Sequence, residues 1–218
     1  MKNNVQLESD VRAELAWEPR VDNKEIRVAA TDGVVTLTGS VPSYADKWAA
    51  ERAAEHVFGV KAVANDLAVA VPVVYQRSDT DIAKAVVDAL AWDVQVPDTK
   101  IKAAVTNGWI TLEGEVEWRF QRDAAARAVR NLAGVRGVTN NLSITIKRAS
   151  ASDVGKSIKE ALERRADRTA EHINVATLGS VVTLTGSVPS FGDRRAVEGA
   201  AWSAPGVTDV HDELAVSV

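Results

Sequence analysis

One short segment occurs three times along this chain of 218 residues. The sequence Val-Val-Thr-Leu-Thr-Gly-Ser-Val at positions 34–41 returns as Trp-Ile-Thr-Leu-Glu-Gly-Glu-Val at 109–116 and, identical to the first copy, at 181–188. The offsets of 75 and 72 residues also hold for the flanking features. Such a period predicts three tandem copies of one supersecondary unit. We expect residues shared by all copies to serve the fold, and departures in one copy to mark candidate functional positions.

Each copy is predicted to begin with a helix and a β-hairpin. Apolar residues four apart predict one buried helix face, formed by Leu7, Val11 and Leu15, then Ile82, Val86 and Leu90, then Val154, Ile158 and Leu162. A strand of alternating apolar residues follows in each copy, and the repeated segment is the second strand. Between them, Asp32-Gly33 and Asn107-Gly108 predict type I′ turns, whose two central residues have positive φ, whereas Gly179-Ser180 suits type II′.

A second helix and a third strand complete the copy. Ser43 and Ser190 are expected N-caps, and Gly59, Gly134 and Gly206 are expected C-caps. The fold class is therefore α+β, with three tandem αββαβ units, each a three-stranded sheet covered by two helices. The domains are expected at 1–73, 78–147 and 152–218. The sequence leaves open whether the third strand pairs with the first or the second.

Composition argues against several function classes. A net charge of −4 disfavours a nucleic-acid binder, and the lack of cysteine removes disulfides, thiolate metal sites and thiol catalysis. The three histidines follow no metal-ligand spacing, and no phosphate-binding or dinucleotide motif is present. We therefore expect no catalytic residues, no metal, no cofactor and no enzymatic activity. With no signal peptide or membrane-spanning stretch, the chain as written is expected to be soluble and cytoplasmic, or periplasmic if its N-terminus is truncated.

The order of motifs resembles the BON domain, a bacterial family named for osmotically inducible and nodulation proteins. The resemblance rests on the Asn/Asp-Gly turn, the strand Val-Thr-Leu-Thr-Gly-Ser-Val-Pro-Ser, the helix, the Gly-Val pair and a final Asn-Asn-Leu. It covers nearly the whole chain, and tandem arrays of this kind resemble the osmotically inducible periplasmic class. It implies an αββαβ fold, no known catalysis, and roles in phospholipid or membrane-surface association, envelope maintenance and osmotic stress, with chaperone-like activity in some members.

The middle copy departs from the others in charge. Residues 76–148 hold 11 basic and 9 acidic residues, whereas the flanking copies each have a net charge of −3. Glu117-Trp118 also replaces the Pro-Ser of the other copies. A basic amphipathic helix with aromatic residues at its start fits anionic lipid headgroups. The candidate lipid-binding residues are Trp118, Arg119, Phe120, Arg122, Arg127 and Arg130. The alternative is a solvated helix face, with Trp118 packing against the core or a neighbouring repeat.

Tryptophan is the second unusual feature, with six copies in the chain. Trp17 and Trp92 occupy equivalent positions at the end of the first helix, where the third copy has Arg164. This pattern predicts an inter-repeat or partner contact, with a ligand-binding aromatic as the alternative. Trp48, Trp109 and Trp202 are expected at the rim of an interface.

The expected function is peripheral binding of anionic phospholipid or membrane surfaces by a non-enzymatic stress- and envelope-associated protein. The alternative is a protein-interaction or chaperone-like module that binds a client protein and no lipid. The oligomeric state is left open by the sequence.

Overall fold

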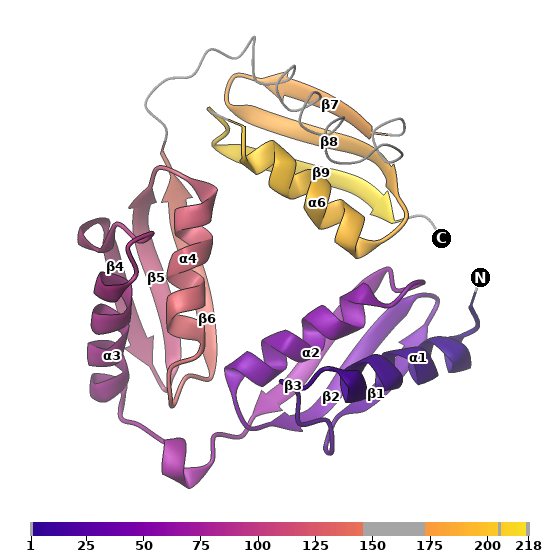
Figure 1. The fold of residues 1–218 in the computed structure, drawn as a ribbon, viewed down its shortest axis with the longest axis horizontal. Helices are drawn as coiled ribbons and strands as arrows, with labels where there is room; N and C mark the ends of the chain where they lie inside the picture. The colour runs from indigo at the N-terminus through magenta and orange to yellow at the C-terminus, as the bar shows by residue number, and fades with distance from the viewer. Residues whose placement is uncertain (1, 146–172, 205, 217–218) are drawn as a thin grey trace. The chain divides into compact units, whose positions relative to one another are not determined.

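Three three-stranded sheets follow one another along the chain, one in each sequence repeat (Figure 1). The computed structural model describes residues 2–145, 173–204 and 206–216. Lys2–Ser143, with the first two repeats, form one compact unit, and the third sheet belongs to another. The predicted α+β class with three tandem units is confirmed. The predicted helix through Val154, Ile158 and Leu162 lies outside the described residues.

The described elements follow the expected order in each repeat. Repeat 1 consists of α1 (Asn4–Trp17), β1 (Arg27–Thr31), β2 (Val34–Val41), α2 (Tyr44–His56) and β3 (Ala62–Val69). The 3₁₀ turn η1 (Val73–Tyr75) leads into repeat 2, with α3 (Asp79–Trp92), η2 (Asp98–Lys100), β4 (Ile101–Thr106), β5 (Trp109–Val116), α4 (Arg119–Arg130) and β6 (Gly137–Ile144). Repeat 3 has β7 (Ile173–Leu178), β8 (Val181–Val188), α6 (Phe191–Trp202) and β9 (Asp209–Val216).

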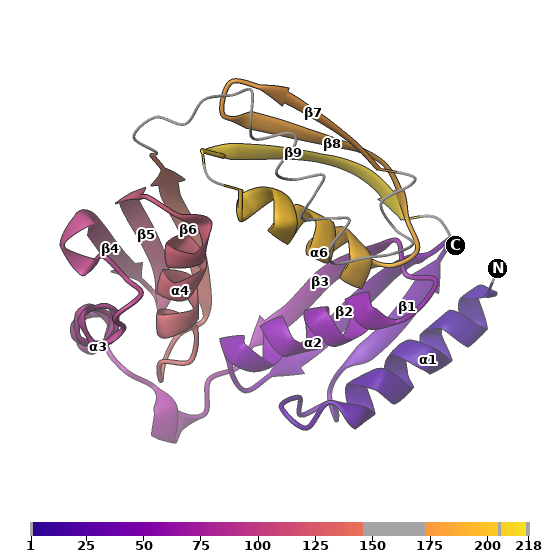
Figure 2. The ribbon, with the colours of Figure 1, turned by 45° about the horizontal axis from the view of Figure 1, so that its top comes forward.

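The repeated segment forms the central strand of every sheet. The orders are β1-β2-β3, β4-β5-β6 and β7-β8-β9, so the third strand pairs with the second, which the sequence had left open. In repeats 1 and 3 the first pair is antiparallel and the second is parallel. A parallel pair needs a crossover, and α2 and α6 provide it in these two repeats. In repeat 1, α1 and α2 lie side by side on one face of the sheet (Figures 1 and 2).

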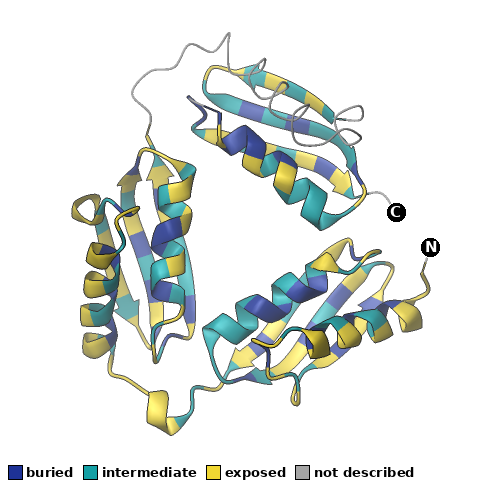
Figure 3. Ribbon diagram, viewed as in Figure 1, coloured by how far each residue is buried: buried dark blue, intermediate teal, exposed yellow. Residues whose placement is uncertain are grey.

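The cores of repeats 1 and 2 lie between the central strand and two helices, and the described core of repeat 3 lies between β8 and α6 (Figure 3). The two inward residues of the central strand are fully buried in all three repeats, as are the inward residues of α1 and α3. These are Val35 and Leu37, Ile110 and Leu112, and Val182 and Leu184, with Leu7, Val11 and Leu15 on α1 and Ile82, Val86 and Leu90 on α3. The repeated segment therefore serves the fold, as its presence in all copies predicts.

The hairpin turns have the predicted backbone. Asp32 and Gly33 have φ of 52° and 88°, and Asn107 and Gly108 have 52° and 78°, as type I′ requires. The predicted C-caps are wrong. The helices end earlier, with Val57, Asn131 and Ser203 as C-caps. The glycines at 59, 134 and 206 stand in the following turn, where their positive φ turns the chain toward the third strand.

Candidate functional site

The start of α4 is capped differently from its counterparts. Ser43 and Ser190 cap α2 and α6 by accepting a hydrogen bond from the backbone N–H three residues later. Trp118 has no such oxygen. Instead the Gln121 side-chain oxygen accepts from the N–H groups of Glu117 and Trp118, at 2.9 and 3.1 Å. The helix keeps its start, and Trp118 and Phe120 remain exposed there.

Of the four candidate arginines on α4, Arg127 is exposed and the other three are half-buried. All four contact other groups of the protein. Arg119 donates to the Asp123 carboxylate at 3.0 Å and Arg127 to the Gln95 side-chain oxygen at 3.4 Å. The Arg130 guanidinium stacks on the Trp48 ring of repeat 1, 3.7 Å from its centroid. Burial lowers the pKa of Arg130 from its ordinary value, and Arg130 stays protonated because that value is so high.

Arg122 joins α4 to the neighbouring strand β6. Its Nη2 donates to the Asn140 carbonyl at 3.2 Å, and the Asn140 amide donates to the Arg122 carbonyl at 2.8 Å. The Asn140 side-chain oxygen accepts from the N–H of Leu142 at 3.3 Å. We call this set of bonds between the second helix and the third strand the helix–strand bracket.

The helix–strand bracket recurs in the other repeats. In repeat 1, the Lys47 ammonium donates to the Leu67 carbonyl at 2.8 Å, and the Asn65 amide donates to the Lys47 carbonyl at 3.1 Å. In repeat 3, Arg194 Nε donates to the Asp212 carboxylate at 2.7 Å and its Nη2 to the Asp212 carbonyl at 3.3 Å. Arg122 therefore has a structural role shared by all three repeats.

Trp17 and Trp92 are the most exposed aromatic residues described, at 84% and 90%. Neither is covered by a neighbouring repeat within Lys2–Ser143, so partner contact stays a prediction for both. Trp202 was expected at an interface rim, and this is wrong, because its ring lies in the core of repeat 3. Trp109 lies against Gly137, and its indole N–H donates to the Thr139 hydroxyl at 2.8 Å.

The topology brings Trp92 and the start of α4 to one end of repeat 2. Ile101, the first residue of β4, pairs with Gly114 near the end of β5, so the loop after α3 and the turn before α4 share that end. The ion pair between Lys100 and Glu117, at 3.1 Å, joins the two segments. We call this region the aromatic end of repeat 2; its exposed apolar residues are Trp92, Val94, Trp118 and Phe120.

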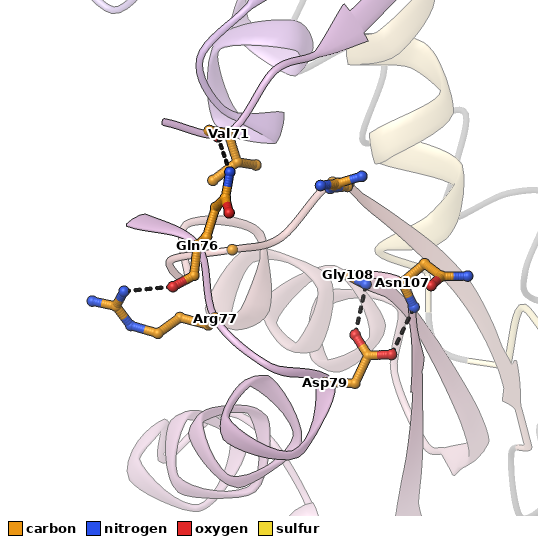
Figure 4. Close-up of a pocket in the computed structure, with 8 residues that line it drawn as sticks. Val71, Gln76, Arg77, Asp79, Asn107 and Gly108 are labelled. Atoms are coloured by element: carbon orange, nitrogen blue, oxygen red, sulfur yellow. Dashed lines mark hydrogen bonds between the residues drawn. The ribbon is translucent and has the colours of Figure 1, made fainter. Parts of the chain in front are cut away.

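An open pocket of about 230 Å³ lies at the opposite end of repeat 2 (Figure 4). The Asp79 carboxylate accepts hydrogen bonds there from the N–H groups of Asn107 and Gly108, at 2.7 and 2.8 Å, and so ties the start of α3 to the β4–β5 turn. Arg77 and Arg136 also line the pocket. Within the described parts of the chain, no group of three histidine, cysteine or acidic residues is placed to hold a metal ion.

A family model for the BON domain matches residues 3–71, 78–146 and 150–217, which is nearly the whole chain. The chain belongs to the BON domain family. Osmotically-inducible protein Y of Escherichia coli (strain K12) is 30% identical to it over 140 residues, which are 62% of this chain and 70% of that protein. Among the described residues, no helix of this BON protein is long and apolar enough to cross a bilayer.

Two solved structures of CdsD, a structural protein of the type III secretion system of Chlamydia trachomatis, were also matched. The C-terminal domain of CdsD is 15% identical, with 100% of both chains covered and a TM-score of 0.28. The other structure is 15% identical, covers 96% of this chain and 91% of that one, and has a TM-score of 0.27. These scores are too low to show a shared fold.

The helix–strand bracket can be recognised by comparing the sequences of the three BON repeats. Lys47, Arg122 and Arg194 stand at the offsets of 75 and 72 residues, so a basic residue occurs in every copy. The same holds for the polar residues Asn65, Asn140 and Asp212. By contrast, Trp118 and Phe120 are replaced by small residues in the other two repeats. Trp118 and Phe120 are therefore candidate lipid-binding residues particular to repeat 2, and lipid binding by all six candidates stays a prediction.

Replacing Arg122 with alanine is expected to lower the free energy of unfolding by about 1 kcal/mol, because one half-buried hydrogen bond to a carbonyl is lost. Denaturant unfolding measures the change. Lys47→Ala in repeat 1 is the matched comparison and should cost a similar amount. If Arg122→Ala left stability unchanged while Lys47→Ala reduced it, Arg122 would have no structural role.

Proposed function

We propose that this BON protein is a non-enzymatic envelope protein that associates peripherally with anionic phospholipid surfaces through the aromatic end of repeat 2. The observation that carries the proposal is the exposure of Trp118 and Phe120 on either side of Arg119, with Trp92 at the same end. Tryptophan favours the membrane–water interface, because its ring is apolar and its N–H still reaches polar groups.

Charge supports an anionic rather than a neutral surface. Repeat 2 is the basic repeat, and each arginine or lysine near an anionic bilayer contributes about 1 kcal/mol to binding. Arg127 is exposed on α4. Acidic neighbours such as Asp123 and Glu117 offset part of this attraction. We therefore expect weak binding that is sensitive to salt, with the aromatic side chains supplying the remainder.

The proposed link to osmotic stress rests on the relative named osmotically-inducible protein Y. The family resemblance also favours the periplasm as the compartment. Vesicle binding by the purified protein depends neither on the link to osmotic stress nor on the compartment.

The full chain is expected to sediment with vesicles containing phosphatidylglycerol and to stay in solution with pure phosphatidylcholine. The double variant Trp118→Ser with Phe120→Ser should bind about tenfold more weakly, since two apolar side chains no longer leave water on binding. Phe58→Ser is the matched control, because Phe58 and Phe120 are 52% and 51% exposed. Absence of wild-type binding at low salt would contradict the proposed function.

A client-binding module is the second candidate function. The exposed Trp17 and Trp92, on equivalent helices of two repeats, favour it. In that case the chain should suppress aggregation of an unfolded test protein without lipid, and Trp17→Ala with Trp92→Ala should remove the effect while the far-ultraviolet circular dichroism is unchanged. Suppression that survives both substitutions would exclude these tryptophans as the binding residues.

A further inference from the structure

The turn η1 between repeats 1 and 2 presents three consecutive apolar residues to solvent. Val73 and Val74 are 84% and 70% exposed, and Tyr75 is also exposed. Side chains of this kind are usually buried against other apolar groups, and a contiguous exposed set marks an interaction surface. Its position in a short linker makes it unlike the buried apolar faces of α1 and α3.

The backbone of this turn is held by several hydrogen bonds. The N–H of Tyr75 donates to the Pro72 carbonyl at 2.9 Å, and the N–H of Gln76 donates to the Val73 carbonyl at 3.2 Å. Arg77 Nη1 donates to the Val74 carbonyl at 3.0 Å. The Gln76 side-chain amide donates to the Val71 carbonyl at 3.2 Å, as Figure 4 shows. The turn therefore keeps its apolar side chains outward in a defined conformation.

The apolar turn is particular to this linker. At the offset of 75 residues, Arg148, Ala149 and Ser150 stand where Val73, Val74 and Tyr75 stand in the first linker. The repeat architecture thus does not require apolar residues at these positions. Their occurrence in only one of two equivalent linkers points to a function outside the fold.

Two cations lie near the residues that flank the turn. Arg77 follows it in the chain, and Arg136 lines a pocket together with Val71, Gln76 and Arg77. Among the described residues, the Arg136 guanidinium has no hydrogen-bond or ion-pair partner, and its side chain is exposed. The acidic residue of the pocket is Asp79, whose carboxylate accepts hydrogen bonds from the N–H groups of Asn107 and Gly108. Apolar side chains with cations nearby match an anionic bilayer surface. The apolar side chains enter the acyl boundary, and the cations contact the phosphates.

We propose that the η1 turn is a membrane-inserting wedge, with Val73, Val74 and Tyr75 entering an anionic phospholipid surface and Arg77 and Arg136 binding its phosphates. This rests on the proposed function and adds a second contact, at the opposite end of repeat 2 from the aromatic end. Helix α3 has 14 residues and runs from one end to the other, so the two ends lie about 21 Å apart. A bilayer that touches both would run along repeat 2.

Vesicle binding of the full chain tests the wedge. Val73→Ser with Val74→Ser should weaken binding to phosphatidylglycerol-containing vesicles about tenfold, and Arg136→Gln about fivefold with a shallower salt dependence. Val5→Ser is the matched control, because Val5 is an exposed valine on α1. If the wild type binds and the double variant binds equally well, the wedge is overturned while the proposed function stands. If the wild type does not bind, the proposed function itself fails.

A single introduced cysteine gives an independent measure, since the chain has none of its own. A nitroxide attached to Val74→Cys should become accessible to oxygen, which concentrates in the bilayer, and protected from a water-soluble paramagnetic reagent when vesicles are added. The same label at Val5→Cys should remain in water. A label at position 74 that stays in water while the chain is bound would overturn the wedge. Loss of self-association by the serine variant in light scattering, with vesicle binding unchanged, would reassign the turn to a contact between copies of the chain.

Discussion

Gly114→Ala is expected to destabilise repeat 2 by about 4 kcal/mol or more. Gly114 has φ of 136°, a conformation essentially restricted to glycine, and a Cβ built there would lie 2.1 Å from the Lys100 carbonyl oxygen. The obstacle is the backbone of Lys100 at the end of η2, directly before β4, so no side chain can rotate to make room. The alanine variant must therefore break the pairing of β4 with the end of β5 or leave repeat 2 unfolded.

Hydrogen exchange of peptides from β4–β6 measures this effect locally, because tandem repeats need not unfold in one transition. Gly179→Ala in repeat 3 is the control, measured by hydrogen exchange of peptides from β7–β9. Gly179 also has a positive φ, 63°, but nothing lies within 4 Å of its added Cβ. That variant should lose only about 1–2 kcal/mol, the ordinary cost of left-handed backbone for alanine. Equal losses at the two positions would show that the close approach to Lys100 is not decisive.

Leu112→Ala is expected to lower the free energy of unfolding of repeat 2 by about 3 kcal/mol. Leu112 lies on the central strand β5 and has no exposed surface. Its truncation removes apolar burial and leaves a cavity that strands on both sides prevent from closing. The same measurement on Leu178→Ala, at a leucine that is 85% exposed, should give a change below about 0.5 kcal/mol.

An equal response of these two leucines would contradict the assignment of the repeated segment to the core. These two substitutions test the fold independently of lipid binding, since neither leucine lies in the aromatic end of repeat 2 or in the η1 turn. Vesicle binding by Leu178→Ala should match that of the wild type.

Local chemistry explains why most of the fold was predictable from the sequence. The Asp32-Gly33 and Asn107-Gly108 turns follow from the few residues that accept positive φ, and the buried positions of α1 and α3 follow from helical periodicity. The threefold repeat then extends each local inference to the next copy. The helix C-caps were wrong because a glycine near a helix end does not distinguish the cap from the turn beyond it.

The candidate site was predictable only in part. The sequence identified Trp118 and Phe120 as departures from the repeat, and both are exposed in the structure. The sequence predicted a basic amphipathic helix for α4, but the pattern of one helix does not show which residues of other elements contact it. The partners Asn140 and Trp48 come from another strand and another repeat, so the bond from Arg122 and the stacking of Arg130 depend on packing.

The sequence by itself determined the number of repeats, the order of elements, the hairpin turns and the buried positions, because each depends on residues close together in the chain. Only the tertiary structure decided that the third strand pairs with the second, that Arg122 belongs to a helix–strand bracket and that Arg136 lines a pocket with Gln76 and Arg77, which follow the η1 turn. These features join segments far apart in the sequence, and their energies depend on distance and burial, which composition and spacing do not specify.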